Sequence, residues 1–440
     1  MDPLIRFFIE VGKLKSLKRR GWVLRGIRNP ESVADHSFRV FLLAWLLGGE
    51  KRINLKRLLK LALVHSLSAV HIDYISPYEK LLDTKSKKEL LKKYPALVLR
   101  APVTEKGKIV LKRFEEEKRA IKQLTRDLPE SIQNEINYLW LDFQRKTSRE
   151  ARLLKAVDRL ENLIQALEYK NQMSRELLIP FLSQVDEVTD DRRILNFAKS
   201  ISKYFVEGKD KVRNIKNYHL IRFISEVGKL KTIKRIGWIY GGAKEKETES
   251  VAAHSFRLCL MCWLLVGRRR FDLEKLLKMA MIHDLVIVYA GDSTPFDDLI
   301  KGNLRDDKKT LEKWPSRLRG EKERITTERR CKERKALDRL LKDLPTALRD
   351  EILALWFEYE EGFSKDGRFV RQVCRIEKLL QAIEYHVKKI YKPDIDPYWT
   401  QLKLLLDDPV LIEFVEKVDK SFYTKGKVSP KFVDKLALTK

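Results

Sequence analysis

Four of the seven histidines in the chain form two pairs with the same spacing. His36 and His65 lie 29 residues apart in the first half, and His254 and His283 repeat that separation in the second. Asp284 directly follows the last of them. Imidazole nitrogens with a carboxylate form a mixed donor set that suits a divalent transition metal. The alternative is a pair of hydrogen-bonded core histidines in each half.

The two histidine pairs belong to a repeat that runs through the chain. Residues 3–39 return at 219–257, and single positions further along match as well: Trp22 with Trp238, Pro129 with Pro345, Trp140 with Trp356, and Glu161 with Glu377. Such self-similarity indicates internal duplication. The 440 residues are too many for one compact core, whereas half that number is enough. We therefore predict two consecutive domains, 1–216 and 217–440.

The elements that must position these residues are predicted to be helices. Apolar residues recur at three- and four-residue spacing in both halves, as in LKRLLKLALVHSL and RLENLIQALEY, and no alternating strand pattern competes. Proline is tolerated in the first turn of a helix but not in its interior, so Asp-Leu-Pro at 127–129 and 343–345 predicts a helix boundary. The apolar runs 40–47 and 258–266 are too short to cross a bilayer and predict buried helices. The predicted fold class is all-α.

The segments that carry these residues resemble the HD-domain phosphohydrolases, and within them the metal-dependent 5′-deoxynucleotidases. The resemblance rests on ESVAAHSFR at 249–257, KLLKMAMIHDLVIVYAGDSTP at 275–295 and IEKLLQAIEYH at 376–386, with corresponding segments in the first half. It therefore covers nearly the whole chain. It implies two helical HD-type domains, each holding one metal through His, His-Asp and a later Asp. It also implies hydrolysis of a nucleoside monophosphate to nucleoside and phosphate.

Each half departs from the implied ligand set at a different position. The second half has His254, His283 and Asp284, but Cys374 stands where the resemblance implies the late aspartate. A thiolate binds zinc or cobalt, so this half could hold a softer metal, with manganese the harder alternative. The first half has the late aspartate but not the early one, since it reads His36, His65, Ser66 and Asp158. A hydroxyl lacks the charge that offsets a dication, which makes the first site the weaker one.

A glutamate expected to assist proton transfer is missing from both halves. The motif HD-x-x-E places it three residues after the aspartate, where this chain has Ala69 and Ile287. General acid–base assistance is typically worth about 100- to 10,000-fold in rate. Neither side chain can transfer a proton, and the losses are spread over both copies. This pattern favours two degenerate domains, although a slow enzyme working through the second domain stays open.

Most of the residues that the resemblance implies for substrate binding are present in this chain. Asp292 in GDSTP matches the position that contacts the sugar, and Arg19 with Trp22 and Arg235 with Trp238 match phosphate and base contacts. Arginine offers a planar fork to phosphate oxygens, and tryptophan offers a stacking face. Simple core packing is the alternative for both tryptophans.

The chain is strongly basic, with a net charge of +28 and a pI near 9.7. Lysines and arginines gather in GKLKSLKRR and in the segments 84–113 and 301–334. Clustered basic residues are typical of phosphate-backbone binding, so RNA, a ribosome or another polyanion is a predicted partner. The alternative is a surface rich in ion networks, as in proteins of hot-growing organisms.

Two functions remain open at this point. The first is a non-catalytic tandem HD-domain protein, a pseudoenzyme that binds RNA or a ribonucleoprotein through its basic surface. The second is a divalent-metal-dependent 5′-deoxynucleotidase that acts through its C-terminal domain. We expect a cytoplasmic protein without membrane association, in which the two domains imitate a dimer within one chain. The four cysteines lie in the second half, and the pair Cys259 and Cys262 is interpreted as packed core thiols.

Overall fold

The structure is a computed structural model of the whole chain, and it describes most of the residues. The described residues are 1–49, 53–72, 103–173, 178, 181, 184–207, 213–267, 269–294, 319–390, 395–424 and 427–428. Much of the two basic segments predicted to meet a polyanion, residues 84–102 and 301–318, lies outside them.

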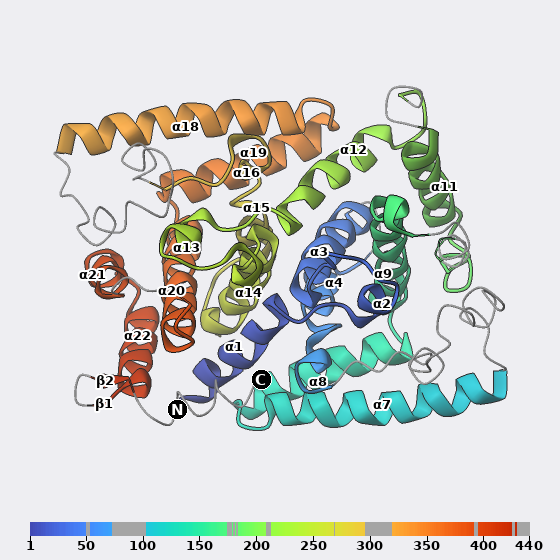
Figure 1. Cartoon of the computed structure of the whole chain (residues 1–440), viewed down its shortest axis with the longest axis horizontal. Coiled ribbons are helices and arrows are strands. Elements are labelled where there is room, and N and C mark those ends of the chain that lie inside the picture. The colour runs from blue at the N-terminus through green and yellow to red at the C-terminus, as the bar shows by residue number, and fades with distance from the viewer. Residues whose placement is uncertain are drawn as a thin grey trace. The chain divides into compact units, whose positions relative to one another are not determined.

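The described part of the chain is built from helices (Figure 1), which confirms the all-α prediction. The helices in the first copy of the repeat are α1 (Pro3–Gly12), α2 (Arg20–Leu24), α3 (Val33–Gly48), α4 (Leu55–Val64), α7 (Val103–Thr125), α8 (Glu130–Arg145), α9 (Arg149–Glu168) and α11 (Arg192–Glu207). Those in the second copy are α12 (Tyr218–Val227), α13 (Ile236–Tyr240), α14 (Val251–Val266), α15 (Leu273–Ile282), α16 (Ile287–Ala290), α18 (Arg319–Leu341), α19 (Thr346–Glu361), α20 (Lys365–Val387), α21 (Asp396–Leu405) and α22 (Pro409–Phe422). Two-residue strands β1 (Tyr423–Thr424) and β2 (Lys427–Val428) pair after α22.

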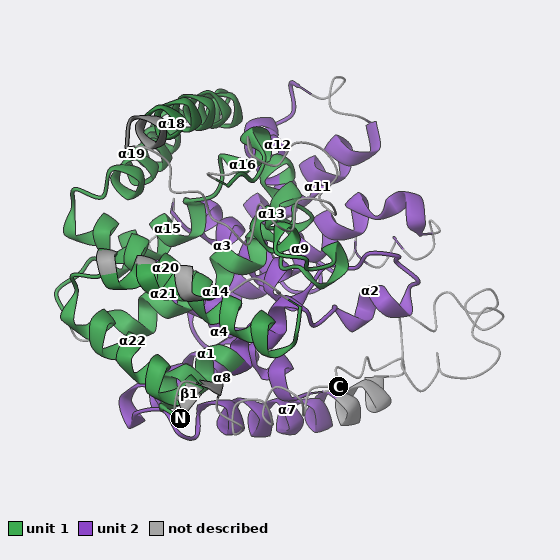
Figure 2. Ribbon diagram, turned by 60° about the vertical axis from the view of Figure 1, so that its left-hand side comes forward, with its two compact units in different colours: residues 1–9, 225–440 green, residues 10–224 purple. Residues whose placement is uncertain are grey.

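The chain divides into two compact units, coloured separately in Figure 2. Unit 2 comprises residues 10–224, and unit 1 comprises residues 225–440 together with residues 1–9. The units thus follow the two copies of the repeat, except that the first residues of each copy belong to the other unit. The division falls within α1 and within α12.

The core of unit 2 forms around α3, which packs against α4 and α9. Helix α3 is buried along almost its whole length, because most of its sequence, VADHSFRVFLLAWLLG, is apolar and its charged Arg39 is paired. Its start is fixed by a capping box. The Ser32 hydroxyl accepts from the Asp35 backbone N–H, and the Asp35 carboxylate accepts from the Ser32 backbone N–H in return. This cap sets the register of His36, one residue further along.

Unit 1 repeats this arrangement with α14 at its centre, packed against α15 and α20. Ser250 caps α14 through the Ala253 backbone N–H, but Ala253 has no carboxylate to complete the box. The predicted buried run 258–266 lies in this helix, and Cys259 and Cys262 are fully buried within it. Burial raises the pKa of both thiols well above the usual value, as expected for packed core cysteines.

Proline separates two long helices in each copy, as the sequence predicts. Helix α7 ends at Thr125 and α8 begins after Pro129, while α18 ends at Leu341 and α19 begins after Pro345. Both prolines occupy the N-cap position, where a missing backbone N–H removes no helical hydrogen bond.

The amino-terminal residues pack within unit 1. Phe8 is fully buried, and its ring meets that of Phe414 on α22 edge to face at 6.0 Å between centroids. Lys417 on the same helix lies 3.8 Å from the Asp2 carboxylate. In unit 2, residues from the start of α12 take the matching place, and the Tyr218 ring lies 5.8 Å from that of Tyr204 on α11.

Within the described ranges, no helix is both long and apolar enough to span a membrane.

Candidate metal centre

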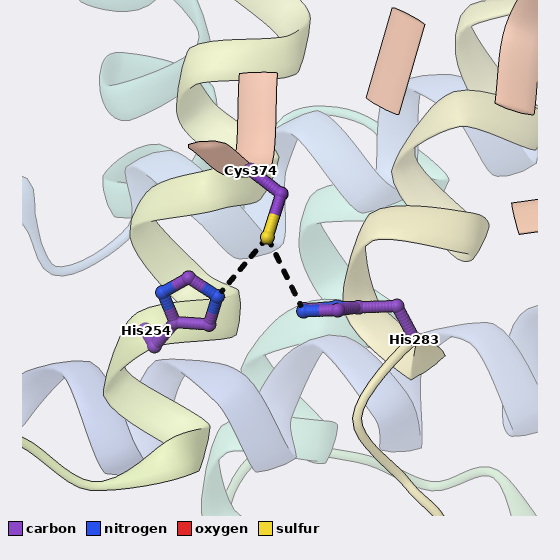
Figure 3. A group of neighbouring side chains, drawn as sticks. All are labelled: His254, His283 and Cys374. Atoms are coloured by element: carbon purple, nitrogen blue, oxygen red, sulfur yellow. Dashed lines mark hydrogen bonds between the residues drawn. The ribbon is translucent and has the colours of Figure 1, made fainter. Parts of the chain in front are cut away.

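Three donor atoms converge in the interior of unit 1 (Figure 3). The Cys374 Sγ atom lies 3.7 Å from His254 Nε2 and 3.9 Å from His283 Nε2. His254 comes from α14, His283 follows the last residue of α15, and Cys374 comes from α20. The packing of these three helices therefore brings together residues that are far apart in the sequence.

Both imidazoles of this group are held in the orientation that a metal ligand needs. His254 Nδ1 is hydrogen-bonded to the Glu377 carboxylate, and His283 Nδ1 lies 2.9 Å from the Ala280 carbonyl oxygen, to which it donates. Each Nε2 atom is thereby left to face the centre. Metal-binding histidines commonly anchor their second ring nitrogen on a carboxylate or a carbonyl in this way.

The spacing of the donors fits a tetrahedral metal. Zinc–sulfur and zinc–nitrogen bonds of about 2.3 and 2.0 Å give a sulfur–nitrogen separation of about 3.5 Å in a tetrahedron. The observed separations of 3.7 and 3.9 Å are close to it. The Asp284 Oδ2 atom lies 3.2 Å from His283 Nε2 and can supply an oxygen at the same place. Of the ligand set that the sequence proposes, His254, His283 and Cys374 are therefore brought together, and Asp284 adjoins them through His283.

The electrostatics of the group favour a thiolate. Burial alone would raise the pKa of Cys374, but Lys378 and the two histidines outweigh it and hold the pKa well below the usual thiol value. Burial would lower the pKa of His283, yet Asp284 and Cys374 raise it to about 10. A metal that binds here must displace protons from the imidazoles, so its affinity rises with pH in the range where they titrate.

Arg235 and Asp292 form a second layer next to Asp284. The Arg235 guanidinium lies 2.7 Å from Asp284 Oδ2 and 3.5 Å from Asp292 Oδ1. Asp292 also accepts a hydrogen bond from the Ile236 backbone N–H at 2.7 Å, which fixes the start of α13. Two of the predicted substrate residues, Arg235 and Asp292, thus lie beside Asp284, where one cation and two carboxylates hold each other in place.

Unit 2 contains a corresponding group made of His36, His65 and Asp158. His36 Nε2 lies 3.1 Å from Asp158 Oδ1 and 3.4 Å from His65 Nε2. His36 Nδ1 is bonded to the Glu161 carboxylate, and His65 Nδ1 lies 2.7 Å from the Ala62 carbonyl oxygen. The three predicted ligands are therefore also together, and their ring nitrogens are anchored as in unit 1.

The missing aspartate changes the charge of the group in unit 2. Ser66, which replaces it, hydrogen-bonds the Ser37 hydroxyl at 2.6 Å. Burial and the neighbouring His36 lower the pKa of His65 to about 4, the opposite of the shift at His283. Arg19, which has no such aspartate to pair with, donates to Glu31 and Asn162. The donors that remain for a metal in unit 2 are the two imidazoles and one carboxylate of His36, His65 and Asp158.

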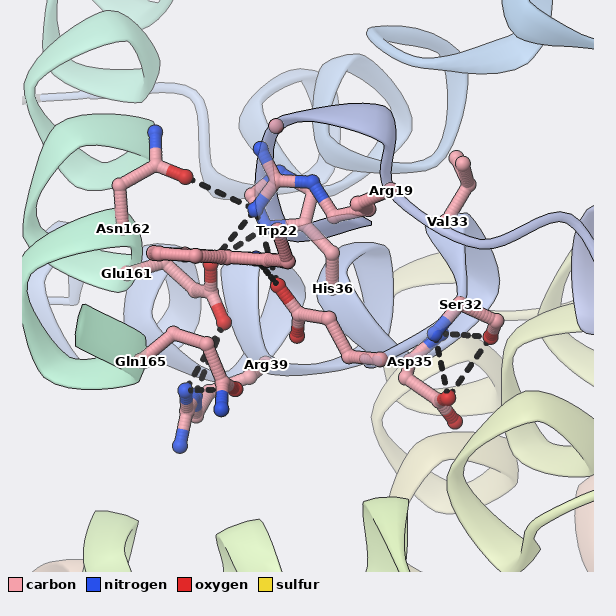
Figure 4. Close-up of polar contacts among 12 residues, drawn as sticks. Arg19, Trp22, Ser32, Val33, Asp35, His36, Arg39, Glu161, Asn162 and Gln165 are labelled. Carbon is pink, nitrogen blue, oxygen red and sulfur yellow. Dashed lines mark hydrogen bonds and ion pairs between the residues drawn. The ribbon is translucent and has the colours of Figure 1, made fainter. Parts of the chain in front are cut away.

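A buried ionic network lies next to each histidine group and holds it in position. In unit 2 (Figure 4), Arg39 binds Glu161, Gln165 and Glu168 on α9, and Glu161 holds His36. In unit 1, Arg257 binds Glu377, Gln381 and Glu384 in the same way. Buried charges need such pairing, and the network fixes the glutamate that orients each histidine. Arg39 and Arg257 occupy matched positions of the repeat, but the sequence alone does not indicate this role.

The two tryptophans proposed as base contacts lie in packed surroundings. Trp22 and Trp238 are almost fully buried, and their indole N–H groups donate at 2.9 Å to Glu31 and Glu249. The Trp22 ring stacks on Phe181, and the Trp238 ring stacks on Tyr398. This placement favours the packing interpretation, since both faces and the polar edge already have protein neighbours.

The positions expected to carry a catalytic glutamate are apolar and buried. Ile287 is the first residue of α16 and Ala69 lies in a short 3₁₀ helix, each less than a tenth exposed. Tyr359, which was not proposed from the sequence, lies close by in unit 1. Its ring is 5.0 Å from that of His283.

The fold and the paired histidine centres define an HD-domain protein. The HD-domain family matches residues 11–198 and 227–400 of this chain, and the chain therefore belongs to that family. The two matched regions confirm the predicted tandem arrangement.

Particular relatives agree with the predicted branch. The chain is 30% identical over 199 residues to 5'-deoxynucleotidase HDDC2 of Xenopus laevis, which covers 45% of this chain and 85% of that protein. It is 34% identical over 168 residues to 5'-deoxynucleotidase HDDC2 of Mus musculus, and this match covers 38% of this chain and 70% of that protein. Among solved structures, a conserved hypothetical protein from Pyrococcus furiosus aligns with a TM-score of 0.33 and 24% identity, over 45% of this chain and 98% of that one.

Proposed function

We propose that the chain is a divalent-metal-dependent phosphohydrolase of the 5′-deoxynucleotidase type and that unit 1 carries the reaction. The observation that carries the proposal is the convergence of His254 Nε2, His283 Nε2 and Cys374 Sγ, with each imidazole anchored through Nδ1. The names of the relatives, 5'-deoxynucleotidases at about a third identity, support the same reaction class. The donor group and the relatives' names therefore favour the phosphohydrolase over the non-catalytic scaffold for a polyanion, which no relative's name supports.

The proposed metal ligands are His254, His283, Asp284 and Cys374. A bound divalent cation would supply Lewis-acid activation of water and of a phosphoryl oxygen. Arg235 is proposed to bind the phosphate, because its guanidinium lies beside Asp284 at the edge of this group and its planar fork suits phosphate oxygens. Asp292 holds that guanidinium and the start of α13 in position. Unit 2 is proposed to keep a scaffold role, since Ser66 removes a carboxylate from its donor set.

The test is phosphate release from a panel of deoxynucleoside monophosphates with cobalt, manganese or zinc added. We expect release by the unaltered chain and its loss in His283→Ala, because that variant removes one of two imidazole donors. The matched variant His65→Ala in unit 2 should keep it.

Two outcomes would contradict the proposal. Equal loss in both histidine variants would contradict the assignment to unit 1. No release with any of the metals would contradict the proposed enzymatic activity altogether. The net charge of +28 would then be the remaining indication of function.

A further inference from the structure

A cleft of about 550 Å³ lies in unit 2, between the first turn of α9 and the segment that leads into α11. The two helices pack against each other, so residues far apart in the sequence line the same space. Ile53, Leu153 and Ile194 give it apolar walls, and none of its lining residues belongs to the histidine group. Small-molecule sites typically measure about 300–1,000 Å³, so this cleft has room for a ligand of about nucleotide size.

Three arginines and two aspartates line the cleft, and they do not neutralise one another. Asp191 is occupied, because it lies 3.4 Å from the Arg193 guanidinium and accepts from the Arg193 backbone N–H at the start of α11. Arg152 donates to two backbone carbonyl oxygens in the loop before α9. Arg149 and Asp190 form no hydrogen bond or ion pair within the described part of the chain. Charged groups of both signs are therefore available to a ligand.

The two arginines on α9 are arranged to bind an anion. Arg149 and Arg152 are three residues apart, so they lie on the same face of the helix, at its first turn. The amino-terminal end of a helix carries a partial positive charge, which adds to that of the two guanidinium groups. The planar fork of a guanidinium matches phosphate oxygens. A phosphate group therefore suits this end of the cleft.

The repeat provides an internal comparison, because the matching charges in unit 1 are paired. Asp407 is the counterpart of Asp190, and it accepts from the Gln372 side chain at 2.6 Å. The Gln372 amide oxygen accepts in turn from the Asp407 backbone N–H at 3.0 Å. Arg368, one turn before Gln372, lies 3.8 Å from the same carboxylate. Unit 2 has Ala156 in place of the glutamine, so Asp190 lacks this partner.

Aromatic rings occupy the corresponding space in unit 1. Phe271 and Phe369 stand at the positions of Ile53 and Leu153, and the two rings lie 4.8 Å apart. The Nζ atom of Lys365, the first residue of α20, lies 4.1 Å from the centre of the Phe271 ring. The smaller side chains of unit 2 leave this space to the cleft.

We propose that the cleft binds a phosphate ester of about nucleotide size. Arg149 and Arg152 hold the phosphate, the apolar walls contact the body of the ligand, and Asp190 accepts from one of its hydroxyl or amino groups. The site gives unit 2 a ligand of its own, beyond its role as a scaffold. Binding here involves no bond breaking and does not depend on hydrolysis by unit 1.

The experiment measures the binding of adenosine monophosphate and of inorganic phosphate by titration calorimetry, with a chelator present. The full-length chain carries Arg235→Ala throughout, which removes the phosphate contact proposed for unit 1. Arg149→Ala together with Arg152→Ala should weaken the binding of both probes by about tenfold or more, because two charged donors are lost. The matched pair Lys365→Ala and Arg368→Ala in unit 1 should leave both affinities unchanged.

A third variant, Asp190→Ala, separates the two parts of the site. It removes the acceptor for a hydroxyl or amino group, so the affinity for adenosine monophosphate should fall by about fivefold or more. The affinity for inorganic phosphate should not fall, because the carboxylate repels that anion.

Three outcomes would overturn the inference. The first is no binding of adenosine monophosphate by the chain in which the cleft is intact. The second is an equal loss in the two matched pairs of variants, because binding would then reflect surface charge in general. The third is unchanged affinity for adenosine monophosphate in Asp190→Ala, which would contradict the class of ligand. Failure of phosphate release by unit 1 leaves the inference standing, since neither probe has to be turned over.

Discussion

Cys374 distinguishes the donor set of unit 1 from that of unit 2. It occupies the repeat position of Asp158, so the two units present the same pair of histidines with a thiolate in one case and a carboxylate in the other. Sulfur favours zinc and other soft ions, whereas carboxylate oxygen suits manganese and other hard ions. We therefore expect the two donor sets to differ in metal preference, through this position as well as through Asp284 and Ser66.

Cys374→Asp should move the metal preference of unit 1 toward manganese. We expect the ratio of bound manganese to bound zinc to rise by about tenfold, equivalent to about 1.4 kcal/mol. The measurement is metal content by mass spectrometry after exposure to equal concentrations of both ions, in a chain that also carries His65→Ala so that only unit 1 contributes. An unchanged ratio would show that Cys374 is not a ligand.

Asp142 links three helices of unit 2 at the level of the elements. Its carboxylate accepts from Arg57 on α4 at 2.6 Å, and it accepts both the backbone N–H and the hydroxyl of Ser148 at 2.9 and 2.6 Å. Ser148 is the N-cap of α9, the helix that carries Asp158 and Glu161. Asp142 therefore helps to hold the start of the helix that supports the histidines.

Asp142→Asn should destabilise unit 2 by about 1–3 kcal/mol, because it replaces an acceptor oxygen by an amide N–H₂ that faces the donors of Arg57 and Ser148. Ser148 and Arg57 outweigh the effect of burial and lower the pKa of Asp142. The stabilisation is therefore present above the unfolded pKa of about 4 and is lost as pH falls through the lower folded value.

Hydrogen exchange in α9 as a function of pH measures this contribution. Glu358→Gln, at the matched position in unit 1, is the control and should leave exchange in α9 unchanged. Wild-type exchange of α9 in Asp142→Asn would contradict the prediction.

The sequence predicted the helical elements and the histidine groups because both depend on local patterns. Apolar spacing marks helices directly, and the repeat shows His36 and His65 a second time as His254 and His283. Arg39 and Arg257 gave no such signal. Their partners Glu161 and Glu377 lie on another helix, far along the chain, and meet them only through tertiary packing.

At the scale of the whole molecule, the compact units and the sequence repeat do not coincide. Residues 1–9 belong to unit 1, and Ile221 and Ile224 at the start of α12 belong to unit 2. All of these segments are apolar, and Ile5, Phe7, Phe8, Ile221 and Ile224 are buried. The predicted boundary near residue 216 follows the repeat, which cannot reveal the unit in which a segment packs.

Phe8→Ala should therefore destabilise unit 1, although Phe8 lies at the start of the chain. Loss of a buried phenylalanine side chain typically costs about 3–5 kcal/mol. The measurement is hydrogen exchange, which should accelerate in α22 and remain unchanged in α11. The matched variant Ile224→Ala should give the reverse pattern, and acceleration in α11 for both variants would contradict the division into units.

The placement of residues 1–9 also has a consequence for synthesis on the ribosome. These residues emerge first, but the helices of unit 1 against which they pack emerge only after residue 225. Their apolar side chains stay without their packing partners while the whole of unit 2 is translated. The first residues to be synthesised are therefore among the last to be packed. Unit 2, by contrast, can be completed as soon as residue 224 has left the exit tunnel.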